Sequence, residues 1–311
     1  MEPANVLPVE EIIADICNGD KPLLNSRLGD LSNLSPEDLE LLEQTWGTIE
    51  LKRRQQIVNR LVDLAEDNFE LDFDSIFIIC LKDQDAAIRS EAIEGLWENE
   101  DTSLIIPLID LLNKDSSEKV QSAAAMALGK FAMLAELKKL RSPHAARVCE
   151  ALLAVISDRG KPVEVRHCAL GSAAPLSVPQ VSEAILKAYE SRDPKLRASA
   201  VYAMGKNCDP SWLPTLLEEL SNPDVEIRYE AATACGELGE KEAAPRLIGL
   251  VSDDDVEVQL AAIQALGKIG GNEAKECLEQ CLNDSSETIQ LAAEEALHEL
   301  EIDETPFSFP L

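Results

Sequence analysis

Apolar residues recur along this chain in a fixed pattern with a period of 31 residues over its second half. Each copy reads Val, Ile or Leu, then Arg or Gln, two variable residues, Ala, two more variable residues, and a pair of small or apolar residues. The seven copies begin at Ile88, Val120, Val165, Leu196, Ile227, Val258 and Ile289. A fixed period of this length predicts stacked, similar units rather than one globular core.

Each of the later repeats contains two helical patterns separated by a polar break. In residues 211–239, Trp212, Leu216 and Leu220 recur at helical spacing, and Ile227 begins a second apolar stripe after the break. An Asp or Ser stands three residues before the first apolar position of the second helix. These residues are Asp85, Ser117, Asp193, Asp224, Asp255 and Ser286. Because Asp and Ser are favourable N-caps, we predict that each begins the second helix of its repeat.

An arginine follows three of these aspartates by four residues. The pairs are Asp85 with Arg89, Asp193 with Arg197, and Asp224 with Arg228. Such an arginine can pair with its own or a neighbouring cap aspartate. This predicts a series of ion pairs from repeat to repeat, which we call the ladder. Where the cap is Ser117 or Ser286, the arginine is replaced by Gln121 or Gln290. We therefore interpret these arginines as structural rather than as a functional site.

The pattern Asp-x-x-Val/Ile-Arg-x-x-Ala-x-x-Ala-Leu-Gly, best matched at 193–205, 224–236 and 255–267, resembles the short HEAT-like repeat common in bacteria. The same repeat type occurs in phycobilisome lyase subunits. The resemblance covers about residues 70–300 and is specific for the repeat class. It implies an all-α fold, a right-handed α-α superhelix (HEAT-like solenoid) of about seven recognisable helix pairs with an N-terminal helical cap.

The remainder of the chain departs from the repeat. We expect residues 1–66 to form the N-terminal helical cap of degenerate helix pairs, 67–300 the repeat array, and 301–311 an acidic tail with Pro and Phe. Val120 and Val165 lie 45 residues apart, which predicts an insertion near 135–147. The tail contains Phe307 and Phe309, and it would either pack over the last repeat or act as a short docking peptide.

The charge of the chain narrows the choice of partners. Its 311 residues carry a formal net charge of −30. This charge disfavours binding to nucleic acid and to anionic membranes, whose phosphates need Lys and Arg. It would instead steer a basic partner toward the protein. No apolar run approaches the ~18 residues that span a bilayer, and no signal-like segment is present, so we expect a cytoplasmic protein with reduced cysteines.

The sequence offers few candidates for catalysis or metal binding. Cys277 and Cys281 could form half of a zinc site, but no second Cys or His pair stands at zinc spacing. His167 and Cys168 are neighbours in a helix and point about 100° apart, so their adjacency does not make a dyad. The repeated His-Glu pairs of HEAT-like deoxyhypusine hydroxylases are matched only at His298. We therefore predict no catalytic residue, no metal site and no cofactor.

The inner face of the second helices remains as a candidate surface. Helical geometry of about 100° per residue places motif positions three and seven opposite the core stripe. Two of the three tyrosines occupy such positions on adjacent repeats, and exposed tyrosines are common binding anchors, although partial burial against the next repeat is equally consistent. We predict a concave binding face formed by Met126, His167, Tyr202, Tyr229, Thr233 and Gln264.

A second candidate surface is basic. Residues 136–166 carry seven Lys or Arg and four Asp or Glu, whereas residues 203–305 carry six and 24. The basic segment consists of Lys138, Lys139, Arg141 and Arg147. It would dock an acidic partner or a phosphate group, or it would form the solvated end of a long helix.

Two functions follow as hypotheses. The first is a non-enzymatic, monomeric HEAT-repeat scaffold or adaptor that binds a protein or peptide partner on its concave face, with a basic partner favoured by the charge. The alternative, implied by the resemblance to lyase subunits, is a bilin lyase-like or chromophore-protein chaperone role. No catalytic constellation in the sequence favours the alternative.

Overall fold

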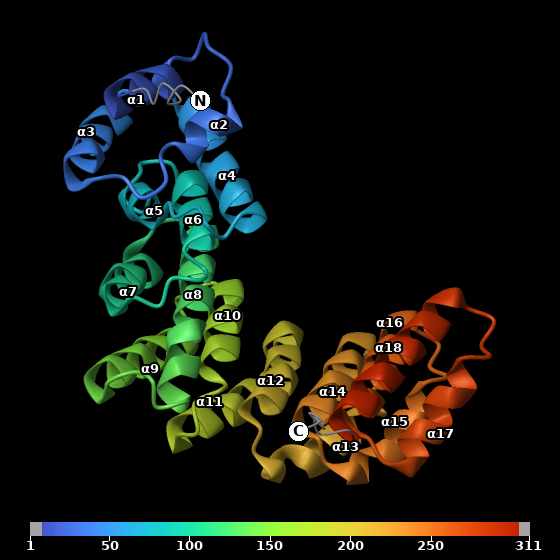
Figure 1. Ribbon diagram of the computed structural model, residues 1–311. Helices are drawn as coiled ribbons and strands as arrows, with labels where there is room; N and C mark the ends of the chain where they lie inside the picture. Colours follow the sequence, from blue (N-terminus) through green and yellow to red (C-terminus); the bar gives the residue numbers. More distant parts are fainter. Residues whose placement is uncertain (1–7, 305–311) are drawn as a thin grey trace, which may run out of the picture. The chain divides into compact units, whose positions relative to one another are not determined.

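The computed structural model describes residues 8–304, with side chains described through residue 300 (Figure 1). Every regular element in this range is a helix, as the apolar periodicity predicts. Contacts divide the chain into two compact units, and the boundary falls between Phe131 and Ala132, inside the long helix α8. No described helix is both long and apolar enough to cross a membrane.

The helices of the two units follow one another with short connections. The first unit contains α1 (Val9–Cys17), α2 (Asn25–Gly29), α3 (Pro36–Trp46), α4 (Leu51–Asp67), α5 (Asp74–Cys80), α6 (Ala86–Gly95), η1 (Thr102–Leu104), α7 (Ile105–Lys114) and most of α8 (Glu118–Glu136). The second contains the end of α8, then α9 (Ser142–Ser157), α10 (Val163–Ala173), α11 (Pro179–Tyr189), α12 (Pro194–Asn207), η2 (Pro210–Trp212), α13 (Leu213–Glu219), α14 (Val225–Leu238), η3 (Lys241–Ala243), α15 (Ala244–Leu250), α16 (Val256–Ile269), α17 (Asn272–Cys281) and α18 (Glu287–Glu304).

In the second unit the helices pair in the way that the repeat predicts. The second helices α10, α12, α14, α16 and α18 pack side by side in chain order, and α11, α13, α15 and α17 each pack against the second helix that follows (Figure 1). The motif residues form the core, because Leu196, Ile227 and Val258 are all buried. The helix pairs confirm the predicted solenoid of stacked units.

Glycine at the end of the motif lets neighbouring second helices approach closely. Gly205 and Gly236 lie one period apart, and a Cβ added to Gly205 would stand 2.6 Å from Ala234 Cα. A Cβ on Gly236 would stand 2.8 Å from Ala265 Cα, and Gly267 meets the next helix in the same way. No side chain fits at such distances, so the small residues of the motif fix the spacing of the stack.

In the first unit, the pair α3–α4 is already joined to the repeat array. Trp46 at the end of α3 donates its indole N–H to Asp83 Oδ2 at 2.7 Å, and Arg54 of α4 pairs with the same carboxylate at 3.0 Å. The predicted cap, residues 1–66, therefore includes a helix pair that contacts the next repeat through the Asp83 carboxylate. Arg53 occupies the place that a buried apolar residue holds in other repeats, and its Nε donates to Ile16 O at 2.6 Å.

The extra residues between the second and third motif copies lengthen two helices. Helix α8 has 19 residues and α9 has 16, compared with 14 in α12. The turn between α8 and α9 holds Lys138 in the left-handed region, with φ of 58°. At the other end, α18 continues to Glu304, so the first four residues of the predicted tail are helical. Phe307 and Phe309 lie outside the described residues.

Candidate functional site

The predicted aspartates begin the second helices as N-caps. Asp85 Oδ1 accepts a hydrogen bond from Ile88 N at 3.2 Å, and Asp224 Oδ1 accepts one from Glu226 N at 3.0 Å. Asp193 and Asp255 each accept from two amides of the first turn. The cap carboxylates are thus already engaged with the backbone of their own helices.

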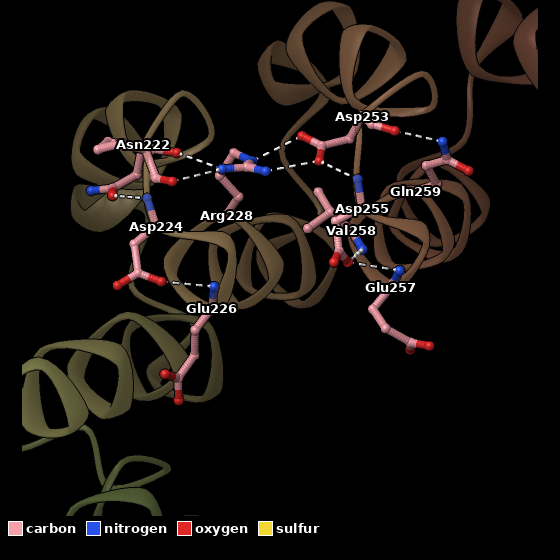
Figure 2. A network of polar contacts seen from close by, with 10 residues as sticks. Asn222, Asp224, Glu226, Arg228, Asp253, Asp255, Glu257, Val258 and Gln259 are labelled. Carbon is pink, nitrogen blue, oxygen red and sulfur yellow. Dashed lines mark hydrogen bonds and ion pairs between the residues drawn. The ribbon is translucent and has the colours of Figure 1, made fainter.

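The arginine that follows each cap pairs with a different carboxylate from the one predicted. Figure 2 shows Arg228 donating from Nε and Nη2 to the two oxygens of Asp253, each at 2.8 Å, while Nη1 donates to Asn222 O at 2.9 Å. Asp253 lies two residues before the next cap, Asp255, and accepts from the Asp255 amide at 2.9 Å. The arginine therefore ties the loop of its own repeat to the loop of the next.

The same arrangement recurs in the first unit. Arg89 donates from Nε and Nη2 to Asp115 at 2.7 and 2.8 Å, and Asp115 lies two residues before Ser117. Arg54 and Asp83 form the preceding pair. A ladder of ion pairs is present, but its acceptors are these loop aspartates and not the caps. The cap oxygens face the first turn of their own helix, which leaves them out of reach of the arginine.

Where the arginine is replaced by glutamine, the bond within the repeat is kept. The side-chain amides of Gln121, Gln259 and Gln290 donate to the carbonyl oxygens of Asp115, Asp253 and Asp284 at 2.5, 2.6 and 2.6 Å. These carbonyls lie six residues earlier, as Asn222 O does for Arg228. Glutamine carries no charge, so it cannot form the ion pair that arginine forms with the next repeat, and the ladder of ion pairs stops at these positions.

Arg197 has a third kind of partner. Its Nη2 donates to Glu219 Oε1 at 2.7 Å, and the Tyr189 hydroxyl and the Asn222 amide donate to the same carboxylate. Burial alone would raise the pKa of Glu219, but the three hydrogen bonds outweigh it and hold that pKa below its usual value. Arg197 also lies over the ring of Tyr189, 5.3 Å from its centroid. The Glu219 carboxylate at the centre of this cluster is buried, and three donors share it.

The residues predicted for the inner face differ in exposure. Met126 is 58% exposed in the first unit, and Tyr229 is 38% exposed in the second. Gln264 is exposed on α16. Tyr202 is half-buried, with the Lys206 ammonium 5.8 Å from its ring centroid and with Gly171 of the preceding repeat against its edge. Thr233 is also half-buried, so the second unit offers Tyr229 and Gln264 as its accessible contacts.

His167 lies in a small cluster rather than on an open surface. Its Nδ1 is 2.5 Å from Ser199 Oγ on the next repeat, and burial lowers its pKa. The ligand atoms of Glu164, His167 and Cys168 all lie within 4.8 Å of one another, which makes them the one candidate metal group in the described part of the chain. However, Glu164 is paired with the Lys195 ammonium, whose positive charge opposes a cation at this place.

The basic segment lies around the turn between α8 and α9. Lys138, Lys139, Arg141 and Arg147 are all exposed, and none of them forms an ion pair with a described carboxylate. No cavity is lined by these side chains among the principal cavities of the described chain. The segment therefore has the solvated surroundings of a long helix end.

The eight cysteines are all free thiols. Cys80, Cys235, Cys277 and Cys281 are buried, and burial raises the pKa of the Cys235 thiol to about 12 and that of Cys281 to about 11. Such thiols are protonated at neutral pH and behave as core residues.

An open groove of about 860 Å³ lies along α6 and α8 in the first unit. Trp97 and Met126 line it, and they are 60% and 58% exposed. Ile93, Ala123 and Ala127 supply the rest of its apolar surface. We call this surface the Trp97–Met126 groove. Met126 was predicted as a contact, whereas Trp97 was not, because it follows the last helical residues of α6 and lies outside the repeated motif.

The rim of the Trp97–Met126 groove is acidic. Glu94, Glu98 and Glu100 line it and are exposed. Of its two lysines, Lys130 donates to Trp97 O at 2.6 Å and to Leu96 O at 3.3 Å, so that its charge is used to cap the carbonyl end of α6. Burial lowers the pKa of Lys130. The accessible charge around the exposed tryptophan and methionine is therefore mainly negative.

Comparison with known proteins identifies the repeat. A family model of HEAT repeats matches residues 74–157 and 213–298, which together make up more than half of the chain. None of the curated proteins matches the sequence. The predicted resemblance to HEAT-like repeats is confirmed.

Solved structures show the same fold at low identity. The complex of CpcE and CpcF of phycocyanin lyase from Nostoc sp. PCC7120 is 19% identical, with 74% of this chain and 88% of that chain covered and a TM-score of 0.54. Yeast importin-beta is 13% identical, with 94% of this chain and 46% of that chain covered and a TM-score of 0.58. This chain therefore spans less than half the length of importin-beta. At these identities the likeness concerns the fold alone.

Proposed function

Because the chain belongs to the HEAT-repeat family, we propose that it is a non-enzymatic scaffold that binds a basic, amphipathic segment of a partner protein in the Trp97–Met126 groove. The observation that carries this proposal is the exposure of a tryptophan and a methionine in one groove that has an acidic rim. Large exposed apolar side chains in a groove are typical binding anchors.

The charge of the groove selects the kind of partner. Glu94, Glu98 and Glu100 would attract Lys or Arg side chains that flank an apolar anchor, and the net charge of −30 would speed the encounter. A helix with an apolar stripe fits such a groove well, since its apolar residues would contact Trp97 and Met126. Methionine is adaptable and suits a surface that accepts different apolar side chains.

Solved HEAT-like structures support a protein partner in general terms. Importin-beta has been solved in complex with Nup1 and with RanGDP, and CpcE has been solved with CpcF. Nup1, RanGDP and CpcF are partners of importin-beta and CpcE, and we do not assign them to this chain. What supports the assignment for this chain is its own groove, together with a repeat class that binds proteins in those structures.

The test uses the full chain and a fluorescein-labelled helical peptide of Leu and Lys, with binding followed by fluorescence anisotropy. We expect the Trp97→Ala, Met126→Ala double variant to bind at least about tenfold more weakly, because both anchors are removed. Phe69→Ala is the matched control, since Phe69 is 90% exposed and lies outside the groove. A Leu and Glu peptide of the same length should bind poorly.

Two results would contradict the proposal. Equal affinity of the double variant and the wild type would remove the groove as the site, and equal affinity for the Lys and Glu peptides would remove the charge argument. Binding should also weaken as salt is raised from about 0.05 to 0.3 M, because exposed charges are screened.

The alternative role on a bilin chromophore stays a prediction. The likeness to CpcE and CpcF is one of fold. Mixing the protein with biliverdin and recording the absorbance spectrum tests this role, and an unchanged spectrum would reject it.

A further inference from the structure

One arginine at the motif position in the second unit, Arg166, has no ion-pair partner among the described residues. Arg166 on α10 follows Val165 in the motif, as Arg89 follows Ile88 and Arg228 follows Ile227. Two residues before the next cap, Asp193, the chain carries Ser191, whereas Asp115 stands at the matching position for Arg89 and Asp253 for Arg228. Arg166 donates from Nε to Ile156 O at 3.0 Å and forms no ion pair with any carboxylate among residues 8–300.

A cavity of about 1010 Å³ lies beside Arg166 and Ser191. Its walls come from the end of α9, from α10 and α11, and from the start of α12. Arg159, Arg166 and Arg192 all line it, together with Ser191. Like Arg166, the exposed Arg159 and Arg192 form no ion pair within the described chain. Three guanidinium groups without a carboxylate partner therefore share one cavity.

The remaining lining is partly apolar and only weakly acidic. Glu183 is paired with Lys187 at 2.6 Å, so the exposed Glu190 is the one lining carboxylate that has no ion pair in the described residues. Apolar side chains make up much of the rest of the lining, from Leu153, Ile156, Leu170, Ala184 and Leu196. A local excess of positive charge stands out in a chain whose net charge is −30.

We propose that this cavity binds a small ligand with an oxyanion group, a phosphate monoester or a carboxylate, attached to an apolar body. The oxyanion would take the place of the missing ladder aspartate and accept from Arg166, as Asp253 accepts from Arg228. Guanidinium groups bind carboxylate and phosphate through two parallel hydrogen bonds. Ser191 Oγ accepts from the Asp193 amide at 3.1 Å, which leaves its own hydroxyl hydrogen for the anion.

The ligand is tested by isothermal titration calorimetry on the full chain with four probes: phenyl phosphate, benzoate, inorganic phosphate and phenol. We expect phenyl phosphate or benzoate to bind one per chain, at least about tenfold tighter than inorganic phosphate or phenol, because only they combine an anion with an apolar body. The tighter of the two identifies the oxyanion. No binding of any probe at millimolar concentration would overturn the proposal.

Ser191→Asp provides the sharpest variant, since it supplies the missing carboxylate. The new aspartate is expected to pair with Arg166 and to accept from the Asp193 amide, as Asp253 does from Asp255. Probe affinity should fall at least about tenfold while the melting temperature is maintained. Gln280→Glu is the control, because it adds the same charge at an exposed position on α17 away from the cavity.

A second variant keeps the test independent of the new ion pair. Arg159→Gln with Arg192→Gln removes two exposed charges and should also abolish probe binding without unfolding, whereas Arg147→Gln outside the cavity should not. Glu190→Gln should tighten binding, because it removes the competing carboxylate. Wild-type affinity in both Ser191→Asp and the double arginine variant would show that the probe binds elsewhere and would overturn the site.

Discussion

Arg228 and Asp253 join two successive repeats through a pair of parallel hydrogen bonds, each 2.8 Å long, between a guanidinium and a carboxylate. Both side chains are largely buried, with 14% and 8% of their side-chain surface exposed. The same arginine holds the carbonyl of Asn222 in its own loop. One side chain thus fixes the geometry of two loops at once.

Arg228→Gln should destabilise the second unit by about 1–3 kcal/mol, because the ion pair is lost while the bond to Asn222 O can be kept, as in the repeats that carry glutamine. The midpoint of urea unfolding measures the change. Arg147→Gln, which removes an exposed arginine without an ion pair, should change stability by less than about 0.5 kcal/mol. Equal stability of both variants would show that the ladder contributes nothing.

Gly236→Ala should destabilise the stack by about 1–3 kcal/mol, although alanine favours helices more than glycine. The added Cβ would stand 2.8 Å from the Ala265 backbone, so α14 and α16 would have to separate. Gly249→Ala is the matched control, because nothing lies within 4 Å of its Cβ position on α15. Thermal unfolding should show a lower melting temperature for the first variant and an unchanged or higher one for the second.

Glu230 should make the stability of the second unit fall between pH 4.5 and about 7. Burial, followed by the nearby Glu226 carboxylate, raises its pKa from 4.5 to about 7 in the folded protein. Over that pH interval Glu230 ionises in the unfolded chain while it stays protonated in the folded chain. The free energy of unfolding is therefore highest below pH 4.5 and falls as the pH rises. Glu230→Gln should remove this decline and be about 1–2 kcal/mol more stable than wild type at pH 8, after allowance for partial exposure. Identical pH profiles would refute the assignment.

Tyr229 and Tyr202 should behave differently when replaced by alanine. Tyr229 is 38% exposed, so Tyr229→Ala should leave the melting temperature unchanged. Tyr202 packs against Gly171 and Lys206, and Tyr202→Ala should lower the melting temperature instead. A loss of melting temperature in Tyr229→Ala as large as that in Tyr202→Ala would contradict this difference.

The repeat period, the aspartate caps and the helix pairs could all be predicted from the sequence, because each depends on local spacing. The partners of the arginines could not. Asp224 and Arg228 occur together in the motif, which suggested that they pair, yet the cap oxygen is held by its own helix and the arginine reaches Asp253 in the next repeat. Only the packing of one loop on another reveals that acceptor.

Three further features could not be predicted from the repeat pattern, each for a physical reason. Arg54 forms an ion pair of the ladder with Asp83. It was missed because the preceding residue, Arg53, stands where the motif has an apolar residue. Arg53 is buried there and donates to Ile16 O. Trp97 lies beyond the helical stripe, so its exposure depends on how α6 ends against α8. Ser191 could not be recognised as unusual from the sequence, because the position that accepts from the arginine is known only from the structure.

The distribution of ion pairs also determines how the second unit would respond to a pulling force. Helices α12, α14 and α16 are linked in turn through Glu237, which lies 3.2 Å from Lys206 and 2.6 Å from Lys268, in addition to the Arg228 rung. Between α16 and α18 no ion pair connects residues 256–269 with residues 287–300, because Gln259 reaches only its own loop. Tension applied at the carboxyl end would therefore peel off α17 and α18 first, and the ion-paired helices would separate only at a higher load.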